Sequence, residues 1–309
     1  MKALEIARAY YGQYGAPMLE EQFPELLPHV AAGLFGSGSE CFGFDDDISR
    51  DHDLEPGFCL FLPGEDVIDR RSAFLLERAY AKLPREFMGL RRGLVAPAGG
   101  PRKGVLRTQE FFLARTGTPD GCLDSRAWLA LPDWALAECV NGAVFRDDAG
   151  EVTAIRERLS FYPEDVRRKK LAGRLLLMGQ AGQYNCPRCL RRGERGAAAL
   201  AAAEFVKNGL NAVFLLNRVY EPFYKWSFRA LRELPVLSEL AGPLEAILSG
   251  GDERARQDMI EAAASAVIAE LRRQGLTASG SGDLEDHAGS VNDGVSDPSL
   301  RTLHVLAGV

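Results

Sequence analysis

Two aspartates stand two residues apart in the first third of the sequence, at Asp51 and Asp53. On a β-strand, side chains two residues apart point to the same face, so both carboxylates would face one ligand. Two adjacent carboxylates repel each other unless a cation lies between them. Mg²⁺ prefers oxygen ligands and often bridges carboxylates to substrate phosphates. The pair therefore predicts a magnesium site.

A turn rich in glycine and serine precedes this pair. It follows the apolar run at 30–35 and consists of Gly36, Ser37, Gly38 and Ser39. Glycines allow backbone angles that direct amide N–H groups toward an anion, and serine hydroxyls add donors. Eleven residues separate Ser39 from Asp51, enough for a loop and a return strand. The turn could then bind the outer phosphates of a nucleoside triphosphate.

The order of these features resembles the signature of the DNA polymerase β-like nucleotidyltransferase superfamily. More specifically, three segments resemble a bacterial family named DUF4037: GSGSECFGFDD at 36–46, SRDHD at 49–53 and LLNRVYEPFYKW at 215–226. The likeness extends through nearly the whole chain. It implies that Asp51 and Asp53 bind Mg²⁺ and act in catalysis, while the glycine-serine turn binds the triphosphate.

The superfamily resemblance also implies a third carboxylate on a neighbouring strand. That strand is expected near 105–110, but its centre carries Leu106 and Arg107. Glu110 is the nearest candidate, although it can already belong to a helix. The implied enzyme moves a nucleoside monophosphate, AMP from ATP, to an acceptor hydroxyl. The missing acid leaves an alternative: a nucleotide-binding sensor or scaffold with little or no turnover, acting through a protein partner.

The segment 220–226 is dense in aromatic residues at the expected start of a helix. Two interpretations are open. In one, Phe223 and Trp226 pack in the core of a helix junction. In the other, Lys225 and Tyr220 bind the nucleotide, because a lysine supplies a point charge that stabilises phosphate. Small nucleotidyltransferases that modify antibiotics place a cleft between a catalytic and a helical domain, and the arrangement here looks similar.

Hydrophobic patterning predicts an α+β fold in two parts. The first, 1–160, would contain a small mixed sheet and helices, and the second, 161–309, an all-α bundle. The superfamily resemblance implies that the first part is a nucleotidyltransferase-like domain. Short apolar runs predict strands at 30–35 and 57–62, and a strand that turns into a helix at 105–112. Amphipathic spacing predicts helices at 3–22, 20–27, 64–82, 163–180, 196–216, 223–233, 243–249, 252–274 and 297–306.

Charge and composition disfavour a general nucleic-acid binder, although tRNA remains open as a substrate. The net charge is −6 at pH 7, whereas a duplex-binding protein needs a concentrated basic face. The clearest basic run, 167–170, is expected to be a solvated helix face, and Asp45 to Asp47 a solvated loop. No apolar stretch reaches the length of a membrane span, and a cytoplasmic protein is the default expectation.

The six cysteines are scattered and do not form a disulfide framework. Cys186 and Cys189 form a single CxxC motif, whereas a tetrahedral zinc site needs two more soft ligands. Inert thiols, a redox pair and a metal site all remain open for this pair. The sequence has no Walker A motif or nucleophile elbow. In residues 47–58, His52 and Phe58 occupy the positions where an EF-hand loop needs glycine and glutamate.

Overall fold

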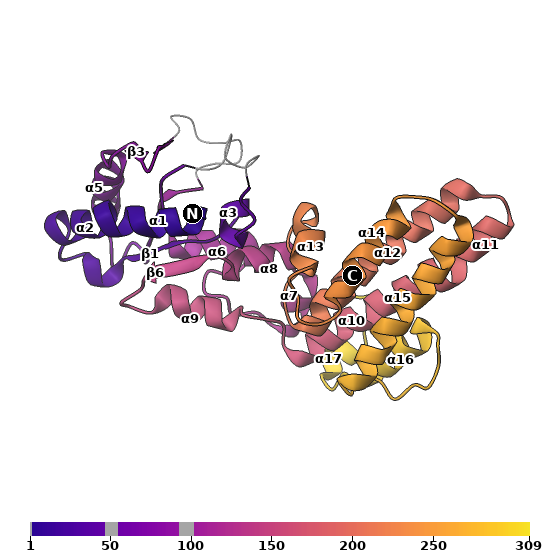
Figure 1. The fold of residues 1–309 in the computed structure, drawn as a ribbon. Coiled ribbons are helices and arrows are strands. Elements are labelled where there is room, and N and C mark those ends of the chain that lie inside the picture. The colour runs from indigo at the N-terminus through magenta and orange to yellow at the C-terminus, as the bar shows by residue number, and fades with distance from the viewer. Residues whose placement is uncertain (1, 47–54, 93–101) are drawn as a thin grey trace. The chain divides into compact units, whose positions relative to one another are not determined.

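The computed structural model describes residues 2–46, 55–92 and 102–309 (Figure 1). The chain forms two compact units. The first comprises Met1–Cys122 and Ala135–Ser160, and the second Leu123–Trp134 and Phe161–Val309. In the described residues, strands belong to the first unit alone, and the second unit is built from helices. The predicted α+β class is therefore confirmed.

The first unit contains a four-stranded mixed sheet in the order β5-β2-β1-β6. Its strands are β1 (Ala31–Leu34), β2 (Cys59–Leu62), β5 (Gly104–Arg107) and β6 (Ala143–Arg146). β1 pairs antiparallel with β2 and β6, whereas β2 and β5 are parallel. A separate hairpin pairs β3 (Glu86–Phe87) with β4 (Leu90–Arg91). The three predicted strands are confirmed, and β6 is an addition.

Both central strands are buried at every position because helices cover both faces of the sheet. Leu60 and Leu62 join a hydrophobic core with Tyr10, Leu76 and Tyr80 from the helices of one face. The residue between them, Phe61, points to the other face, as the two-residue period of a strand requires. There it stacks on Phe35 at 4.4 Å and contacts Phe111 at 5.4 Å between ring centroids.

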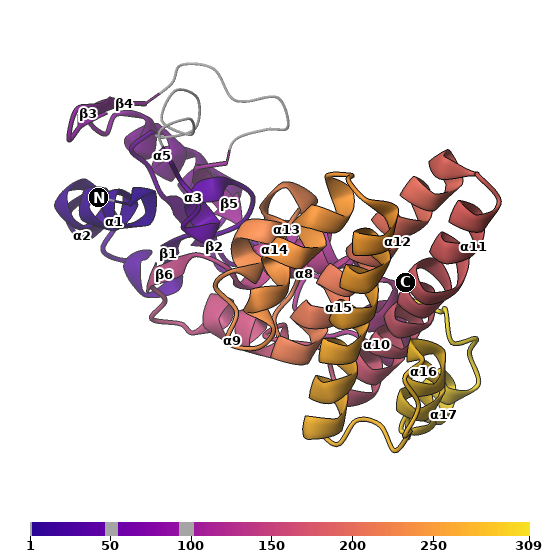
Figure 2. The same cartoon turned by 45° about the vertical axis from the view of Figure 1, so that its right-hand side comes forward.

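Helices occur in the predicted stretches 3–22 and 64–82, whereas α3, α8 and α9 are additions. The predicted helix at 20–27 is wrong, because α2 ends at Gln22, just before Phe23 and Pro24. α1 contacts β1, and α5 contacts β5 (Figure 2). The predicted helix at 3–22 is interrupted by one π-helical segment, η1 (Tyr11–Gly15). Gly15 admits Phe58 there, since an added Cβ would lie 2.4 Å from its ring. The bounds are α1 (Ala3–Tyr10), α2 (Ala16–Gln22), η2 (Leu27–His29), α3 (Ser39–Phe42), α5 (Arg70–Ala81), α6 (Thr108–Thr116), α8 (Asp133–Val140) and α9 (Glu151–Arg158).

The second unit is organised around α10 (Glu164–Met178), which packs against α12 (Arg195–Asn217) and α16 (Leu284–Asp293) (Figure 1). α14 packs against α12 and α15. The other bounds are α7 (Ser125–Ala130), η3 (Gly179–Asn185), α11 (Cys186–Arg191), α13 (Tyr224–Leu231), η4 (Ser238–Leu240), α14 (Ala241–Leu248), α15 (Glu253–Arg273) and α17 (Pro298–Arg301).

The basic run at 167–170 is not the solvated helix face that its composition suggested. Arg167, Lys169 and Lys170 are 2%, 0% and 3% exposed. Such burial is tolerated only where hydrogen bonds replace water around each charge. Lys169 Nζ donates to Asn292 Oδ1 at 2.8 Å and to the Leu303 carbonyl at 2.7 Å. The hydrogen bonds of this run therefore stabilise the position of α10 inside the bundle.

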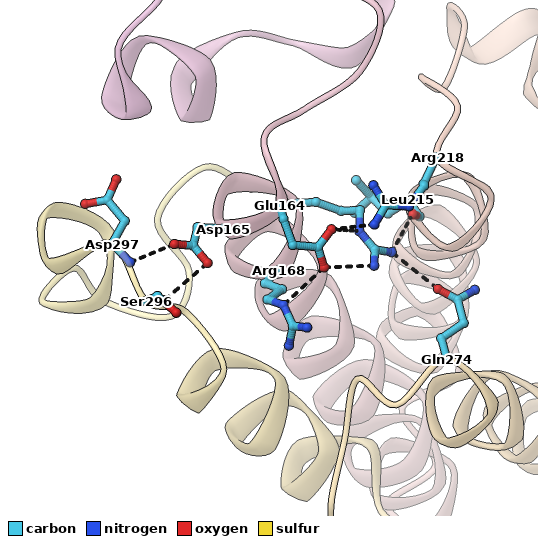
Figure 3. Close-up of polar contacts among 9 residues, drawn as sticks. Glu164, Asp165, Arg168, Leu215, Arg218, Gln274, Ser296 and Asp297 are labelled. Atoms are coloured by element: carbon cyan, nitrogen blue, oxygen red, sulfur yellow. Dashed lines mark hydrogen bonds and ion pairs between the residues drawn. The ribbon is translucent and has the colours of Figure 1, made fainter.

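Arg167 makes the densest part of this network, and Figure 3 labels its partners Glu164, Leu215 and Gln274. Its guanidinium donates two hydrogen bonds of 3.1 Å to the Glu164 carboxylate and one of 3.1 Å to the Leu215 carbonyl. Arg168 and Arg218 also donate to Glu164, at 3.1 and 2.6 Å. Partial burial opposes ionisation of Glu164, but Arg167 and Arg218 outweigh it and hold the pKa of this carboxyl below its ordinary value. The first turn of α10 is thereby fixed to the end of α12.

One described helix, Arg195–Asn217, is long and apolar enough to cross a membrane. Its most apolar window is 67% buried within the protein, as expected for a core helix. Asn208 and Asn211 are buried within it and hydrogen-bonded to polar side chains. Packing inside the bundle therefore accounts for its composition.

Candidate functional site

The glycine-serine turn lies directly after β1, as the sequence predicts. Gly36 and Gly38 adopt φ angles of +118° and +119°, a region that favours glycine. The side chain of Asn141 holds Gly36 from both sides: it accepts from the Gly36 N–H and donates to the Gly36 carbonyl, each at 2.8 Å. Because a single amide side chain satisfies both backbone groups, the start of the turn has a defined conformation.

Strand topology places this turn beside the start of β2. β1 and β2 are antiparallel, with Gly33 opposite Cys59, so the end of β1 lies beside the start of β2. Asp51 and Asp53 lie outside the described residues, a few positions before β2. β5 is parallel to β2, with Gly104 opposite Cys59, so its start lies at the same edge.

A buried ion pair lies next to the turn. Lys103 Nζ is 3.9 Å from Glu40 Oε1, with the two side chains 8% and 4% exposed. The ammonium also donates to the Glu55 carbonyl at 2.8 Å. Lys103 immediately precedes β5, and Glu40 follows Ser39 in α3. A positive charge is thus fixed at the sheet edge where the turn emerges.

A second ion pair lies close to the start of the turn. Arg115 lies 3.8 Å above the Phe111 ring, and its Nε is 3.2 Å from Glu138 Oε2. A Cβ added at Gly36 would lie 3.4 Å from Arg115 Nη2 and from the Phe111 ring. Burial raises the pKa of Glu138 even though Arg115 opposes the shift. The φ of +118° favours glycine at position 36, which lies beside a charged side chain and an aromatic ring.

Glu110, the sequence candidate for a third carboxylate, lies in the first turn of α6 and is exposed. β5 ends at Arg107, three residues earlier, and its four residues are Gly, Val, Leu and Arg. No described contact joins Glu110 to the glycine-serine turn. The described strand beside β2 therefore carries no acid, as its sequence indicated.

Lys225 and Tyr220 belong to the second unit. Lys225 is exposed at the start of α13, with its Nζ 5.0 Å from the centre of the Trp226 ring. Tyr220 is 4% exposed and packs edge-on against Tyr162 at 4.9 Å. Its surroundings are those of a core aromatic residue. Phe223, expected in the core under the packing interpretation, is instead 45% exposed.

Sequence reasoning missed the side chains that surround the turn. Asn141, Lys103 and Arg115 carry no local motif, and Asn141 is 105 positions from its partner Gly36. Asp45 was expected in a solvated loop, but its Oδ2 accepts from the Ala3 N–H at 3.1 Å at the start of α1. Each of these contacts depends on tertiary structure, so spacing along the chain could not indicate them.

The CxxC pair occupies α11, where Cys186 is buried and Cys189 is partly exposed, and both thiols are free. Burial raises the pKa of Cys186, which disfavours the reactive thiolate. No group of three or more His, Cys, Asp or Glu side chains suited to a metal occurs in the described part of the chain. Asp51 and Asp53 lie outside that part.

Comparison with protein families gives one match. Residues 128–227 match the family described as Domain of unknown function (DUF4037). The match confirms the DUF4037 resemblance over this part of the chain. It includes the 220–226 segment but not the glycine-serine turn. No curated protein matches the sequence.

Among solved structures, the chain is similar to the crystal structure of a nucleotidyltransferase-like protein from Exiguobacterium sibiricum. The identity is 13%, and the alignment covers 88% of this chain and 76% of that chain at a TM-score of 0.35. A likeness at this TM-score supports no inference about the function of this chain.

Proposed function

We propose that the first unit carries a Mg²⁺-dependent nucleotidyltransferase site that moves a nucleoside monophosphate, AMP from ATP, to an acceptor hydroxyl. One observation carries the proposal. The glycine-serine turn leaves β1 at the sheet edge where the chain that follows Asp51 and Asp53 enters β2. Antiparallel pairing thus supports a common site for phosphate donors and metal ligands that the sequence separates by eleven residues.

In the proposed site, the residues Gly36 to Ser39 supply amide and hydroxyl donors for the outer phosphates. Lys103 adds positive charge at the same edge, moderated by Glu40. Asp51 and Asp53 offer the all-oxygen donor set that suits Mg²⁺, which when bound would neutralise charge on the phosphates. Catalysis would rest mainly on positioning and charge stabilisation.

In the transfer step, the acceptor oxygen attacks the α-phosphorus in line with the leaving pyrophosphate. A bond from the acceptor oxygen to phosphorus forms as the bond to the bridging oxygen breaks. Pyrophosphate leaves toward the glycine-serine turn, and the acceptor proton passes to a base. Glu110 is the sequence candidate for that base.

A second function is favoured by one specific observation. β5 lies beside β2 and consists of Gly104 to Arg107, without a carboxylate. A site with only two acids can bind a nucleotide while turning over slowly or not at all. The protein would then be a nucleotide sensor or scaffold that acts through a protein partner.

Product analysis distinguishes the two functions. The protein is incubated with ATP and Mg²⁺, with and without a small-molecule extract of bacterial cells, and pyrophosphate is measured. Release that depends on the extract supports the transferase. Saturable binding of ATP with no pyrophosphate under either condition supports the sensor. Absence of both binding and release would refute the proposed nucleotide site.

A further inference from the structure

A separate pocket of about 590 Å³ lies entirely within the helical unit. Its walls are formed by residues 129–134, from the end of α7 to the start of α8, by parts of α10 and α12, by the start of α13 and by residues 308–309. This volume falls in the range of small-molecule sites, which combine apolar walls with a few placed polar groups. The residues 128–227 of the DUF4037 match include most of its lining.

One wall of the pocket offers hydrogen-bond acceptors. Asn211 is 4% exposed, and its side-chain amide donates to Asp133 Oδ2 at 2.9 Å and to Glu221 Oε2 at 3.1 Å. The hydroxyl of Tyr162 donates to Asp133 Oδ1 at 2.8 Å. Asn211 Oδ1 is buried and accepts no hydrogen bond from the described residues. Two carboxylates and an unused carbonyl oxygen suit a ligand group that donates hydrogen bonds.

Another wall offers a cation without a close ion-pair partner among the described residues. Arg174 Nη1 donates to the neutral Asn208 Oδ1 at 3.2 Å, and no described carboxylate lies within ion-pair distance of Arg174. Its Nε is buried without a partner among the described residues. Lys170, by contrast, donates to the carbonyls of Leu131 at 3.1 Å and Gly308 at 3.2 Å. A guanidinium binds a carboxylate through two parallel hydrogen bonds, so Arg174 suits an anionic ligand group.

Three large aromatic residues line the same pocket and remain exposed. Trp134 and Phe223 are each 45% exposed, and Tyr224 is 77% exposed. Phe223 and Tyr224 contact each other at 4.5 Å between ring centroids. Exposed rings at a pocket can pack against an aromatic group of a ligand, in an offset-stacked or edge-on arrangement.

We propose that this pocket binds an α-amino acid with an aromatic side chain. Its carboxylate would pair with Arg174, its ammonium would donate to Asn211 Oδ1 and Glu221, and its ring would pack against the exposed aromatics. A polyphosphate fits less well, because it would place several negative charges beside Asp133 and Glu221. The proposal concerns the second unit and does not rest on the nucleotidyltransferase site.

The test is calorimetric titration of the full chain with L-phenylalanine, L-tyrosine and L-tryptophan. We expect saturable binding of at least one, with at least a tenfold loss for the matching amino-acid amide and for its N-acetyl derivative. Arg174→Lys keeps the charge but loses the paired donors, and Glu221→Gln keeps the shape but loses the charge. Each should weaken binding at least tenfold while thermal unfolding shows a folded protein.

Arg273→Lys is the matched control, since Arg273 is 65% exposed on α15 and pairs with Glu270 outside the pocket. It should leave the affinity unchanged. The proposal is overturned if no aromatic amino acid binds at millimolar concentration, or if the amide binds as tightly as the acid. It is also overturned if ADP or inorganic phosphate binds in an Arg174-dependent manner while the amino acids do not.

Discussion

Asn141 is the single side chain on which the glycine-serine turn depends most. Its amide satisfies the N–H and the carbonyl of Gly36 at 2.8 Å each, and the turn follows directly. A buried backbone group that loses its partner costs roughly 1–3 kcal/mol. Asn141 is thus a positioning residue: it touches no proposed ligand, but it fixes the backbone that would bind the phosphates.

Asn141→Ala should weaken Mg²⁺-dependent ATP binding and lower the free energy of unfolding by roughly 1–3 kcal/mol, because Gly36 loses both partners. The matched control is Asn217→Ala. Asn217 bridges Val236 in the same way in the helical unit, at 3.0 and 2.9 Å. The control should lose comparable stability but keep its ATP affinity. Equal loss of affinity in both variants would contradict a specific positioning role for Asn141.

The carboxyl group of Glu221 should make stability depend on pH. Burial raises its pKa above the ordinary 4.5, so the folded protein holds its proton more tightly than the unfolded chain. The unfolding free energy therefore falls as pH rises from 4.5 through the raised value. Glu221→Gln should remove this part of the decline, and urea unfolding at several pH values measures it. If the unfolding free energy of Glu221→Gln depends on pH as that of the unaltered protein does, burial does not shift the pKa of this carboxyl group.

At the scale of secondary structure, the close approach of β1 and β6 requires small residues. An added Cβ at Gly142 would lie 2.1 Å from the Leu34 carbonyl oxygen, and Gly142 has a φ of +60°. At Gly33, an added Cβ would lie 2.7 Å from the Ala143 carbonyl oxygen. These contacts place the end of β1, and with it the turn, against the start of β6.

Gly142→Ala should therefore destabilise the protein by more than its backbone strain alone, which is about 1–2 kcal/mol. The steric overlap adds about 1–3 kcal/mol. Gly150→Ala isolates the strain, because Gly150 has a φ of +73° and no atom within 4 Å of an added Cβ. Chemical denaturation of both variants provides the comparison. Equal losses of stability in the two variants would mean that the contact with β1 does not restrict the size of the side chain at position 142.

The elements predicted best are those with a clear hydrophobic period or with glycine at their ends. β1 and β2 are continuous apolar runs bounded by glycine, and α10 and α15 carry long amphipathic patterns. No element was predicted for β6, since four residues at a sheet edge, each half-buried, leave little hydrophobic signal. The π-helical segments η1 and η3 follow from packing at glycines, and local propensity does not encode them.

At the scale of the whole molecule, long-range contacts determine features that local sequence patterns do not indicate. The basic run at 167–170 is buried because backbone carbonyl and side-chain amide oxygens from α12, α16 and the residues after α17 accept hydrogen bonds from it. No local pattern indicates those partners. Residues 123–134 group with the helical unit because of their long-range contacts with it. By contrast, the glycine-serine turn was predictable, because its glycines and the preceding apolar run are adjacent in the sequence.

Burial of this basic run also bears on nucleic-acid partners. With a net charge of −6 and its clearest cationic run inside the bundle, the protein should not bind duplex DNA or RNA. Filter binding with a random-sequence duplex at low salt should give no retention. Retention that weakens steeply as salt rises would reveal a basic surface elsewhere and contradict this expectation.

The most direct test of the central claim is calorimetric titration with ATP, GTP, CTP and UTP, with and without Mg²⁺. The protein should bind at least one triphosphate, ATP by expectation, only when Mg²⁺ is present. Asp51→Asn and Asp53→Asn should each abolish that binding without loss of thermal stability, whereas Asp69→Asn, which changes the N-cap of α5, should retain it. Unaltered Mg²⁺-dependent binding in both variants would contradict the proposed site.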